Sequence, residues 1–231
     1  MTHPPAKRRP EAMRNDRALL VAAREVLEVH GVHASVARIA DRAGVGIGSL
    51  YRRYRSKEEL FQRLCAIALA DYLAAARAGL TFDDPWHGLL HYVNLSITEG
   101  PGALSSIAGT ITVTAEMAEL SRLGDEAVGA LVARAQKAGI VRPDITPVDL
   151  ELLIEQLSRS PLLEQLKRQG RDDLSAAAVA ARSRTIAIAV DGLKVGKRTD
   201  LPGESAGYEL FWERWSVMPG EGGTPTHDTI E

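Results

Sequence analysis

Residues 35–57 read SVARIADRAGVGIGSLYRRYRSK, and this stretch carries most of the information about the fold. Its apolar residues recur at helical spacing on either side of Gly44, which predicts two short amphipathic helices joined by a turn. Ser35 can cap the first helix through its hydroxyl, and Gly44 can adopt, at no steric cost, the positive φ that commonly ends a helix. The second helix begins with small residues and ends with cationic ones. This pattern predicts a helix-turn-helix of the kind that enters the major groove of DNA.

The charges of this stretch favour a nucleic-acid partner over a purely structural role. Two short helices joined by a glycine turn also occur in all-α proteins that do not bind DNA. A solvated helix face usually mixes Glu with Lys, whereas residues 44–57 contain four cations and no acid. Small residues at the start of the second helix would also let its backbone approach a surface closely. We therefore expect this segment to bind DNA.

The flanking segments extend the pattern in both directions. Residues 17–31 form a candidate helix with an apolar side, and Ser56 with Glu59 forms a capping box that opens the next helix. Residues 17–64 as a whole resemble the N-terminal domain of the tetracycline-repressor (TetR) family. The motifs that carry the resemblance are Ala22-Ala23, Gly31, Ser35, Ile39-Ala40, Ala43-Gly44-Val45, Ser49-Leu50-Tyr51 and Ser56-Lys57-Glu58. The resemblance is specific because many positions agree in order and spacing at once.

The resemblance implies a set of DNA contacts. The hydroxyl side chains and Lys57 would meet phosphates, and the paired arginines that end the second helix would reach a guanine or a phosphate. Ile47 and Gly48 would face base edges or thymine methyl groups, and Arg38 on the preceding helix would share the work. Gly46 and Ile47 stand where family members often carry polar residues, so we expect fewer hydrogen bonds to bases. The residues expected to contact DNA are Ser35, Arg38, Gly46, Ile47, Gly48, Ser49, Tyr51, Arg52, Arg53 and Lys57.

The distribution of charge separates a basic N-terminal part from an acidic remainder. The formal net charge of the chain is only −2, with 25% charged and 45% apolar residues, which is ordinary for a globular protein. Residues 1–60 hold 12 Lys and Arg against 7 Asp and Glu, whereas residues 61–231 hold 16 against 23. A basic module on an acidic body directs one face of the molecule toward nucleic acid.

The rest of the chain predicts an all-α fold, because no segment alternates apolar and polar residues. We expect an N-terminal three-helix helix-turn-helix DNA-binding domain and a C-terminal helical ligand-binding and dimerisation bundle. The expected parts are a disordered basic arm at 1–14, the DNA-binding domain at 15–60, the effector-binding and dimerisation domain at 61–215, and a disordered tail at 216–231. The arm either adds DNA contacts or is a solvated tail, and its composition slightly favours the tail.

Several helices are expected in the C-terminal part. Pro161 is expected to kink or break one of them, and Trp212 in the last is expected to pack on the body. The expected segments are 57–79, 86–99, 103–108, 114–139, 147–166, 173–195 and 208–215. In the TetR family the helices that correspond to 147–166 and 173–195 pair with a second copy, so the resemblance implies a homodimer. The alternative is that these helices pack within one chain.

The resemblance also implies a small-molecule effector held between helices of the body, where bundles form pockets. Polar groups within apolar helices are the candidates, although each is individually more typical of an ordinary structural side chain. The candidate pocket residues are Tyr92, Ser96, Glu99, Thr110, Thr114, Met117 and Gln156. Their mixture predicts a mostly apolar ligand that makes a few hydrogen bonds.

Other kinds of site have little support in the sequence. His87 and His91 are four residues apart, a spacing that can hold a metal, but a third ligand is not evident. Cys65 is the only cysteine, and we expect it to be a buried small hydrophobic residue rather than a redox sensor. We expect no catalytic residues, no cofactor, no metal and no enzymatic activity. Without a secretory signal or a membrane-spanning run, a cytoplasmic location is expected and no membrane partner.

The function that fits these patterns is sequence-specific DNA-binding transcriptional regulation, with a repressor released from its operator by a small molecule as the expected form. The alternative is a helical small-molecule-binding or interaction protein without specific DNA function. The weak polarity of residues 46–48 is the only support for that alternative. Loss of DNA function would be expected to erode the cations of residues 52–57, and these are intact.

Overall fold

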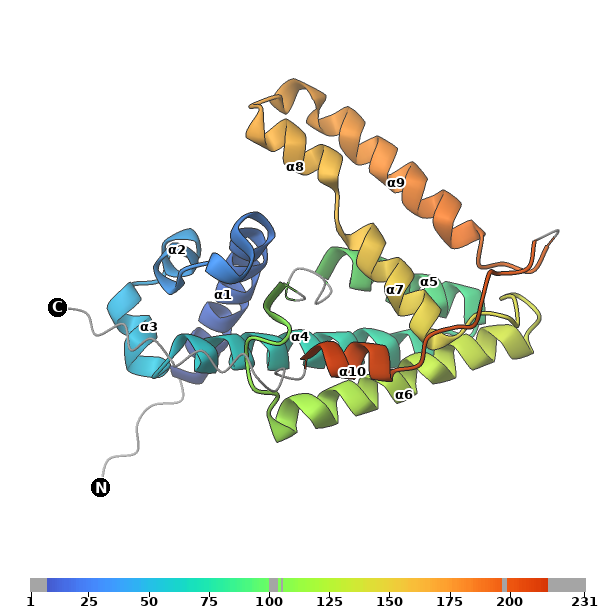
Figure 1. Cartoon of the computed structure of the whole chain (residues 1–231), viewed down its shortest axis with the longest axis horizontal. Helices are drawn as coiled ribbons and strands as arrows, with labels where there is room; N and C mark the ends of the chain where they lie inside the picture. Colours follow the sequence, from blue (N-terminus) through green and yellow to red (C-terminus); the bar gives the residue numbers. More distant parts are fainter. Residues whose placement is uncertain (1–7, 100–103, 105, 197–198, 216–231) are drawn as a thin grey trace. The chain divides into compact units, whose positions relative to one another are not determined.

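The computed structural model describes residues 8–99, 104, 106–196 and 199–215 of the chain (Figure 1). Within these residues the chain is helical, and its only β-type pairing is an isolated bridge between Val141 and Lys194. The all-α prediction is confirmed. The helices are α1 Arg8–His30, α2 Val36–Arg42, α3 Ile47–Arg53, α4 Lys57–Leu80, α5 Pro85–Glu99, α6 Ala115–Lys137, α7 Pro147–Ser158, α8 Pro161–Arg168, α9 Ser175–Asp191 and α10 Glu209–Trp215.

Contacts divide the described residues into two compact units. The first unit falls within 1–64, 104–115 and 208–231, and the second falls within 65–103 and 116–207. Helix α4 contributes its first turns to the first unit and its remainder to the second. The first unit therefore contains the predicted helix-turn-helix, and the second contains most of the predicted effector-binding region.

The turn between α2 and α3 has the predicted geometry. The Ser35 hydroxyl oxygen accepts a hydrogen bond from the backbone N–H of Arg38, which caps α2. Gly44 has a φ of +66°, the left-handed conformation that suits glycine at the end of a helix. The N–H of Val45 then donates to the carbonyl of Ala40, which closes the last turn of α2. Local chemistry alone therefore accounts for this turn.

The N-terminus of α1 lies further upstream than the sequence patterns indicated. Residues 8–14, expected to belong to a disordered arm, form the first turns of α1. Pro10 is compatible with this position, because N–H groups in the first turn of a helix have no intrahelical acceptor to lose. The remainder of the expected arm, residues 1–7, and the expected tail, residues 216–231, lie outside the described residues.

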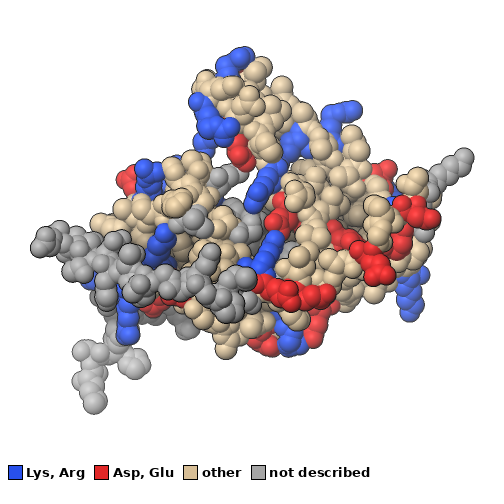
Figure 2. All heavy atoms as spheres, in the orientation of Figure 1, with Lys and Arg blue, Asp and Glu red and all other residues tan. Residues whose placement is uncertain are grey.

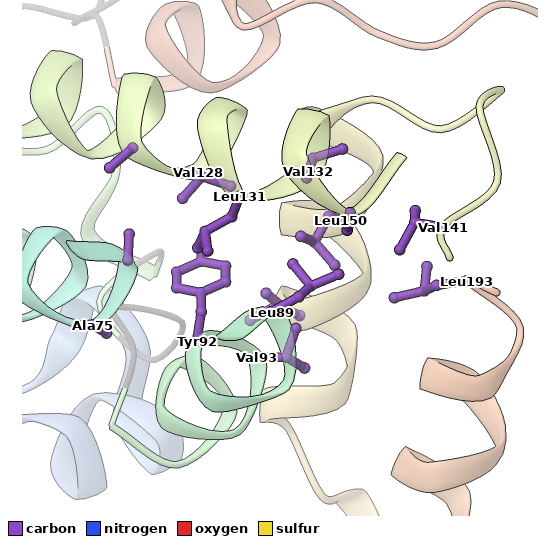
Figure 3. Packing of buried hydrophobic residues seen from close by; sticks show 14 of the residues in the cluster. Ala75, Leu89, Tyr92, Val93, Val128, Leu131, Val132, Val141, Leu150 and Leu193 are labelled. Atoms are coloured by element: carbon purple, nitrogen blue, oxygen red, sulfur yellow. The ribbon is translucent and has the colours of Figure 1, made fainter. Parts of the chain in front are cut away.

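The core of the second unit forms where α5, α6 and α7 meet the C-terminal part of α4. Figure 3 shows the ring of Tyr92 extending from α5 toward α6, next to Leu131. Tyr92 and Leu131 are each 1% exposed, so this contact lies deep in the core. Buried residues of this cluster include Leu73, Ala76, Leu89, Tyr92, Val93, Val128, Leu131, Val132, Leu150, Ile154 and Leu193.

Three glycines allow neighbouring helices to pack closely within the second unit. A Cβ built on Gly88 of α5 would lie 2.2 Å from the carbonyl oxygen of Gly79 on α4. A Cβ built on Gly124 of α6 would lie 2.1 Å from the ring of Tyr72 on α4. Real Cβ contacts are far longer, because protein interiors are close-packed without overlap. Gly79 and Gly88 therefore have no space for a side chain, and one at Gly124 would displace the Tyr72 ring, although all three glycines lie inside helices.

The expected helix at 147–166 is broken into α7 and α8. Thr146 caps α7 and forms a capping box with Asp149, and Pro147 occupies the first turn, as predicted. Arg159 and Ser160 then leave the helical region, because the residue before a proline is disfavoured there. Figure 1 shows α8 and α9 as an antiparallel pair beyond this break. The expected helix at 173–195 corresponds to α9, which ends earlier, at Asp191.

The C-terminal helix forms as predicted, but one of its expected contacts is wrong. Helix α10 spans Glu209–Trp215, within the expected segment. Trp212, which was expected to pack on the body, is 55% exposed and stacks on the ring of Tyr208. The expected short helix at 103–108 appears as 3-10 turns at Leu104 and at 106–107.

The close packing at Gly124 gives a first prediction. Gly124→Ala should lower the free energy of unfolding by about 1–3 kcal/mol, because the Tyr72 ring must move away from its hydrogen-bond partner. Gly129→Ala on the same helix is the matched control, since a Cβ there meets only Pro147 at 4.0 Å. The control should be neutral or raise stability by up to about 1 kcal/mol. Urea unfolding measures both, and equal stability of the two variants would contradict the packing.

The burial of Cys65 gives a second prediction. Burial raises the pKa of the Cys65 thiol from 9.0 to about 12. The thiol should therefore react slowly with Ellman's reagent at pH 8 in the folded protein and rapidly after unfolding. Because the folded pKa is the higher one, the stability contributed by the protonated thiol is complete below pH 9 and is lost as the pH rises toward 12.

The Cys65→Ala variant isolates this effect. The difference in unfolding free energy between the native chain and this variant should be constant below pH 9 and change only above it. A native thiol that reacts as fast as the unfolded one at pH 8 would show that Cys65 is accessible.

Candidate nucleic-acid interface

Helix α3 presents one buried and one exposed face. Of its residues, all of which the structure describes, only Leu50 is buried, and Tyr54 just after it is 5% exposed. The opposite face carries Ile47 and Tyr51, which have 40% and 49% of their surface exposed. Every residue that the sequence predicted to contact DNA is exposed. The outward face is thus the one that carries the small and cationic residues.

Neither glycine at the start of α3 is required by the fold. Gly46 has a φ of −61°, which any residue adopts, and a Cβ there would meet no described atom within 4 Å. A Cβ on Gly48 would meet only a guanidinium nitrogen of Arg52, at 3.9 Å. The absence of side chains here leaves the helix start open, so its backbone can come close to an external surface.

Two residues on α2 or at its start have defined partners. The Ser35 oxygen accepts from the Arg38 N–H at 3.2 Å, which leaves its own hydrogen available to donate to a phosphate. The Arg38 guanidinium lies 2.7 Å from Nε2 of His30 at the end of α1. This contact places the Arg38 cation between the end of α1 and the exposed side of α2.

The two neighbouring arginines of α3 have different environments. Arg53 donates from Nη2 to the buried carboxylate of Asp16 on α1, at 2.9 Å. Tyr54 donates its hydroxyl to the other oxygen of Asp16, at 2.7 Å. Burial, and then the hydrogen bond to Asp16, raise the pKa of Tyr54 well above its usual value. The Asp16 contact occupies Arg53, so Arg52 is the better candidate for reaching a base.

The start of α4 is fixed by its capping residues. The Ser56 oxygen accepts from the Glu59 N–H at 3.0 Å, and the Glu59 carboxylate accepts from the Arg55 N–H at 2.6 Å. Ser56 therefore caps α4 as predicted, whereas the bond back from Glu59 goes to the N–H of Arg55, one residue before the cap that a capping box requires. Lys57 is exposed in the first turn, with its amine 5.3 Å from the centre of the Phe61 ring.

The predicted effector residues are divided between the two units. Tyr92 and Ser96 are buried on the same face of α5, and Met117 is buried near the start of α6. Gln156 is exposed, and the side chain of Glu99 is outside the described part. The remaining two, Thr110 and Thr114, belong to the first unit. Among the described side chains of this set, Tyr92 and Ser96 are therefore the only two that share a buried helix face, that of α5.

A polar cluster in the second unit was missed at the sequence level. The Tyr72 hydroxyl on α4 donates to the Glu151 carboxylate on α7 and lies 3.4 Å from Asp125 on α6. The Tyr72 and Tyr92 rings meet edge to face, with centroids 5.9 Å apart. Burial, Tyr92 and Glu151 together raise the pKa of Tyr72. Asp125 and Glu151 lie on amphipathic helices, where acids are typical of a solvent-facing side, so no sequence signal marked them.

The histidines considered as metal ligands have other neighbours. His87 lies 3.5 Å from the Asp84 carboxylate, and the His91 ring packs against Phe82. Within the described residues no group of three His, Cys, Asp or Glu side chains is placed to hold a metal. None of the helices in these ranges has the length and apolar character needed to cross a lipid bilayer.

Comparisons with known proteins match both parts of this fold. Residues 19–64 match the family model described as bacterial regulatory proteins of the tetR family. Residues 84–195 match the model described as the C-terminal domain of SbtR-like transcriptional regulators. A comparison with curated proteins gave no match.

Two solved structures are similar to this chain, and the first of them shows a related fold. A TetR transcription regulatory protein from Mycobacterium vanbaalenii is 22% identical with a TM-score of 0.53, over 81% of this chain and 99% of that one. A TetR transcriptional regulator from Streptomyces coelicolor is 24% identical with a TM-score of 0.49, over 78% and 98%. Because the N-terminal and C-terminal regions both match models of such regulators, the chain belongs to the TetR family of DNA-binding transcription regulators.

Proposed function

We propose that this regulator represses transcription: it binds an operator as a homodimer and leaves the DNA when a small molecule binds its helical body. Members of the family typically dimerise and respond to effectors. The observation that carries the proposal is the outward face of α3, where Gly46 and Gly48 are open and every predicted contact residue is exposed. A protein that binds operator DNA is expected in the cytoplasm, where that DNA lies. This role requires no enzymatic activity.

The roles of the contact residues follow from their positions. Ser49, Tyr51 and Lys57 carry hydrogen-bond donors on the exposed side of α3 and at the start of α4, where phosphates would lie. The charge of Lys57 adds to the positive end of the α4 dipole. Ile47 faces outward at the first turn of α3 and suits a thymine methyl group, and Arg52 suits a guanine.

The carrier alternative has less support. It rested on the weak polarity of residues 46–48, which would suit a helix with no reading function. The open surroundings of Gly46 and Gly48 give that weak polarity a different explanation, since a helix start without side chains can approach base edges directly. The cations at the end of α3 and the start of α4 add the electrostatic attraction that nucleic-acid binding requires.

The α8–α9 pair supports the dimer. In α9 only Ala178 and Val190 are buried, whereas Val179 is 52% exposed and Ile188 is 71% exposed. Figure 2 shows broad uncharged areas over this pair, between a few Lys and Arg side chains. A second copy would remove this apolar surface from water, and its two-fold symmetry would match two operator half-sites.

The polar cluster of the second unit supports an effector site. Tyr72, Asp125 and Glu151 lie on three different helices, so a ligand that replaced one of their hydrogen bonds would shift the helices relative to one another. Helix α4 carries Tyr72 and begins at Lys57, one of the proposed DNA contacts. A ligand releases the protein only if it binds the released state more tightly than the DNA-bound state.

The DNA contacts give a third prediction. The operator can be obtained by selecting the tightest duplexes from DNA surrounding the gene, with excess competitor DNA. Tyr51→Phe combined with Lys57→Ala should weaken binding to every duplex and reduce the slope of log affinity against log salt by about 1. Lys137→Ala, an exposed cation at the end of α6, is the control and should leave the slope unchanged. An unchanged slope in the double variant would reject the phosphate contacts.

The dimer gives a fourth prediction. Ile188→Glu places a charge on the exposed face of α9, so it should halve the mass measured by light scattering at micromolar concentration and weaken operator binding. Leu210→Glu is the matched control, because Leu210 on α10 is also exposed, at 47%. A control that dissociates equally, or an Ile188→Glu protein that keeps its dimeric mass, would show that α9 is not the interface.

A further inference from the structure

Asp16 is a buried ionisable residue that belongs neither to the proposed DNA contacts nor to the proposed effector site. It lies on α1 with only 3% of the residue exposed. One carboxylate oxygen accepts from the Tyr54 hydroxyl at 2.7 Å, and the other accepts from Arg53 at 2.9 Å. The second oxygen also lies 3.5 Å from Nε of Arg63 on α4. One side chain thus connects α1 to the end of α3 and to α4, all within the first unit.

Stability alone is a weak explanation for this arrangement. Desolvating a carboxylate is costly, and replacing a buried ion pair by apolar residues of similar volume is often neutral or stabilising. The geometric effect is more specific, because each carboxylate oxygen accepts a hydrogen bond from a different residue at the end of α3, and the two bonds together fix that end in position and in rotation. Helix α3 has few other restraints, since Leu50 is the only one of its residues that is buried.

We propose that Asp16 is a positioning residue for operator recognition, acting through Arg53 and Tyr54. It holds the C-terminal end of α3 so that Ile47 and Arg52 meet the bases at a fixed angle, and it keeps Arg53 away from them. The proposal rests on the proposed function, in which α3 reads the operator. Base contacts depend on orientation more than phosphate contacts do, so loss of Asp16 weakens specific binding more than non-specific binding.

The test compares two dissociation constants for each variant, one for the selected operator and one for a scrambled duplex of equal length. Both are measured at the same salt concentration and at 15 °C, where circular dichroism confirms that each variant is folded. Asp16→Asn keeps the size of the side chain and removes its charge. It should lower the ratio of operator to scrambled affinity by about tenfold or more, with the scrambled affinity nearly unchanged.

Glu25→Gln is the matched control, because Glu25 is a more exposed carboxylate on the same helix that pairs with Arg42 of α2. Its affinity ratio should equal that of the native chain. Tyr54→Phe removes a single hydrogen bond to Asp16 and should lower the ratio in the same direction by a smaller factor. If Asp16→Asn does not fold, Tyr54→Phe decides the question.

The outcomes separate the positioning role from its alternatives. An unchanged ratio in folded Asp16→Asn, or equal loss of both affinities, would overturn the proposal, since either result fits a purely structural carboxylate. A rise in operator affinity would also overturn it, by showing that Asp16 competes with DNA for Arg53. If the native chain binds all duplexes equally well, the proposed function itself is wrong. This measurement on the native chain comes before any variant is made.

Discussion

Helix α3 has seven residues, and a helix this short does not persist in water without tertiary contacts. The first unit supplies those contacts on the buried side of α3 and leaves exposed the side that we propose faces DNA. The turn at Gly44 sets the direction in which α3 starts, Leu50 anchors its middle, and Asp16 holds its end through Arg53 and Tyr54. A reading surface with almost no buried residues of its own is therefore held in place by the residues around it.

In the second unit, arginines of neighbouring helices hydrogen-bond to the backbone carbonyls at the ends of two helices. Arg134 on α6 donates to the carbonyls of Leu80 and Phe82, where α4 ends, at 2.9 and 2.5 Å. Arg182 on α9 donates to the carbonyls of Leu157 and Ser158, at 3.1 Å each, where α7 ends. In both places a cation meets carbonyl groups that no longer have an intrahelical donor, at the negative end of a helix dipole. Helix ends in this unit are thus tied to neighbouring helices.

The sequence predicted the features that depend on neighbouring residues. The Ser35 cap, the Gly44 turn, the capping residues of α4 and α7, and the break before Pro161 all follow from chemistry within a few positions. The features it missed are long-range. Asp16 meets Arg53 from 37 residues away, and Tyr72 meets Glu151 from 79 residues away, so no local spacing marks either pair. Burial was also misjudged at Trp212, which is exposed and stacks on Tyr208 instead of packing on the body.

The open surroundings of Gly46 and Gly48 have an evolutionary consequence. Their backbone conformations accept other residues, and nothing described nearby would collide with a new side chain at Gly46. A single base change in the gene could therefore add a polar group to the reading surface without disturbing the fold that supports it. Duplicated copies of such a gene can diverge toward different operators while keeping one scaffold, and an engineer who wants repressors that do not cross-react can begin at the same two positions.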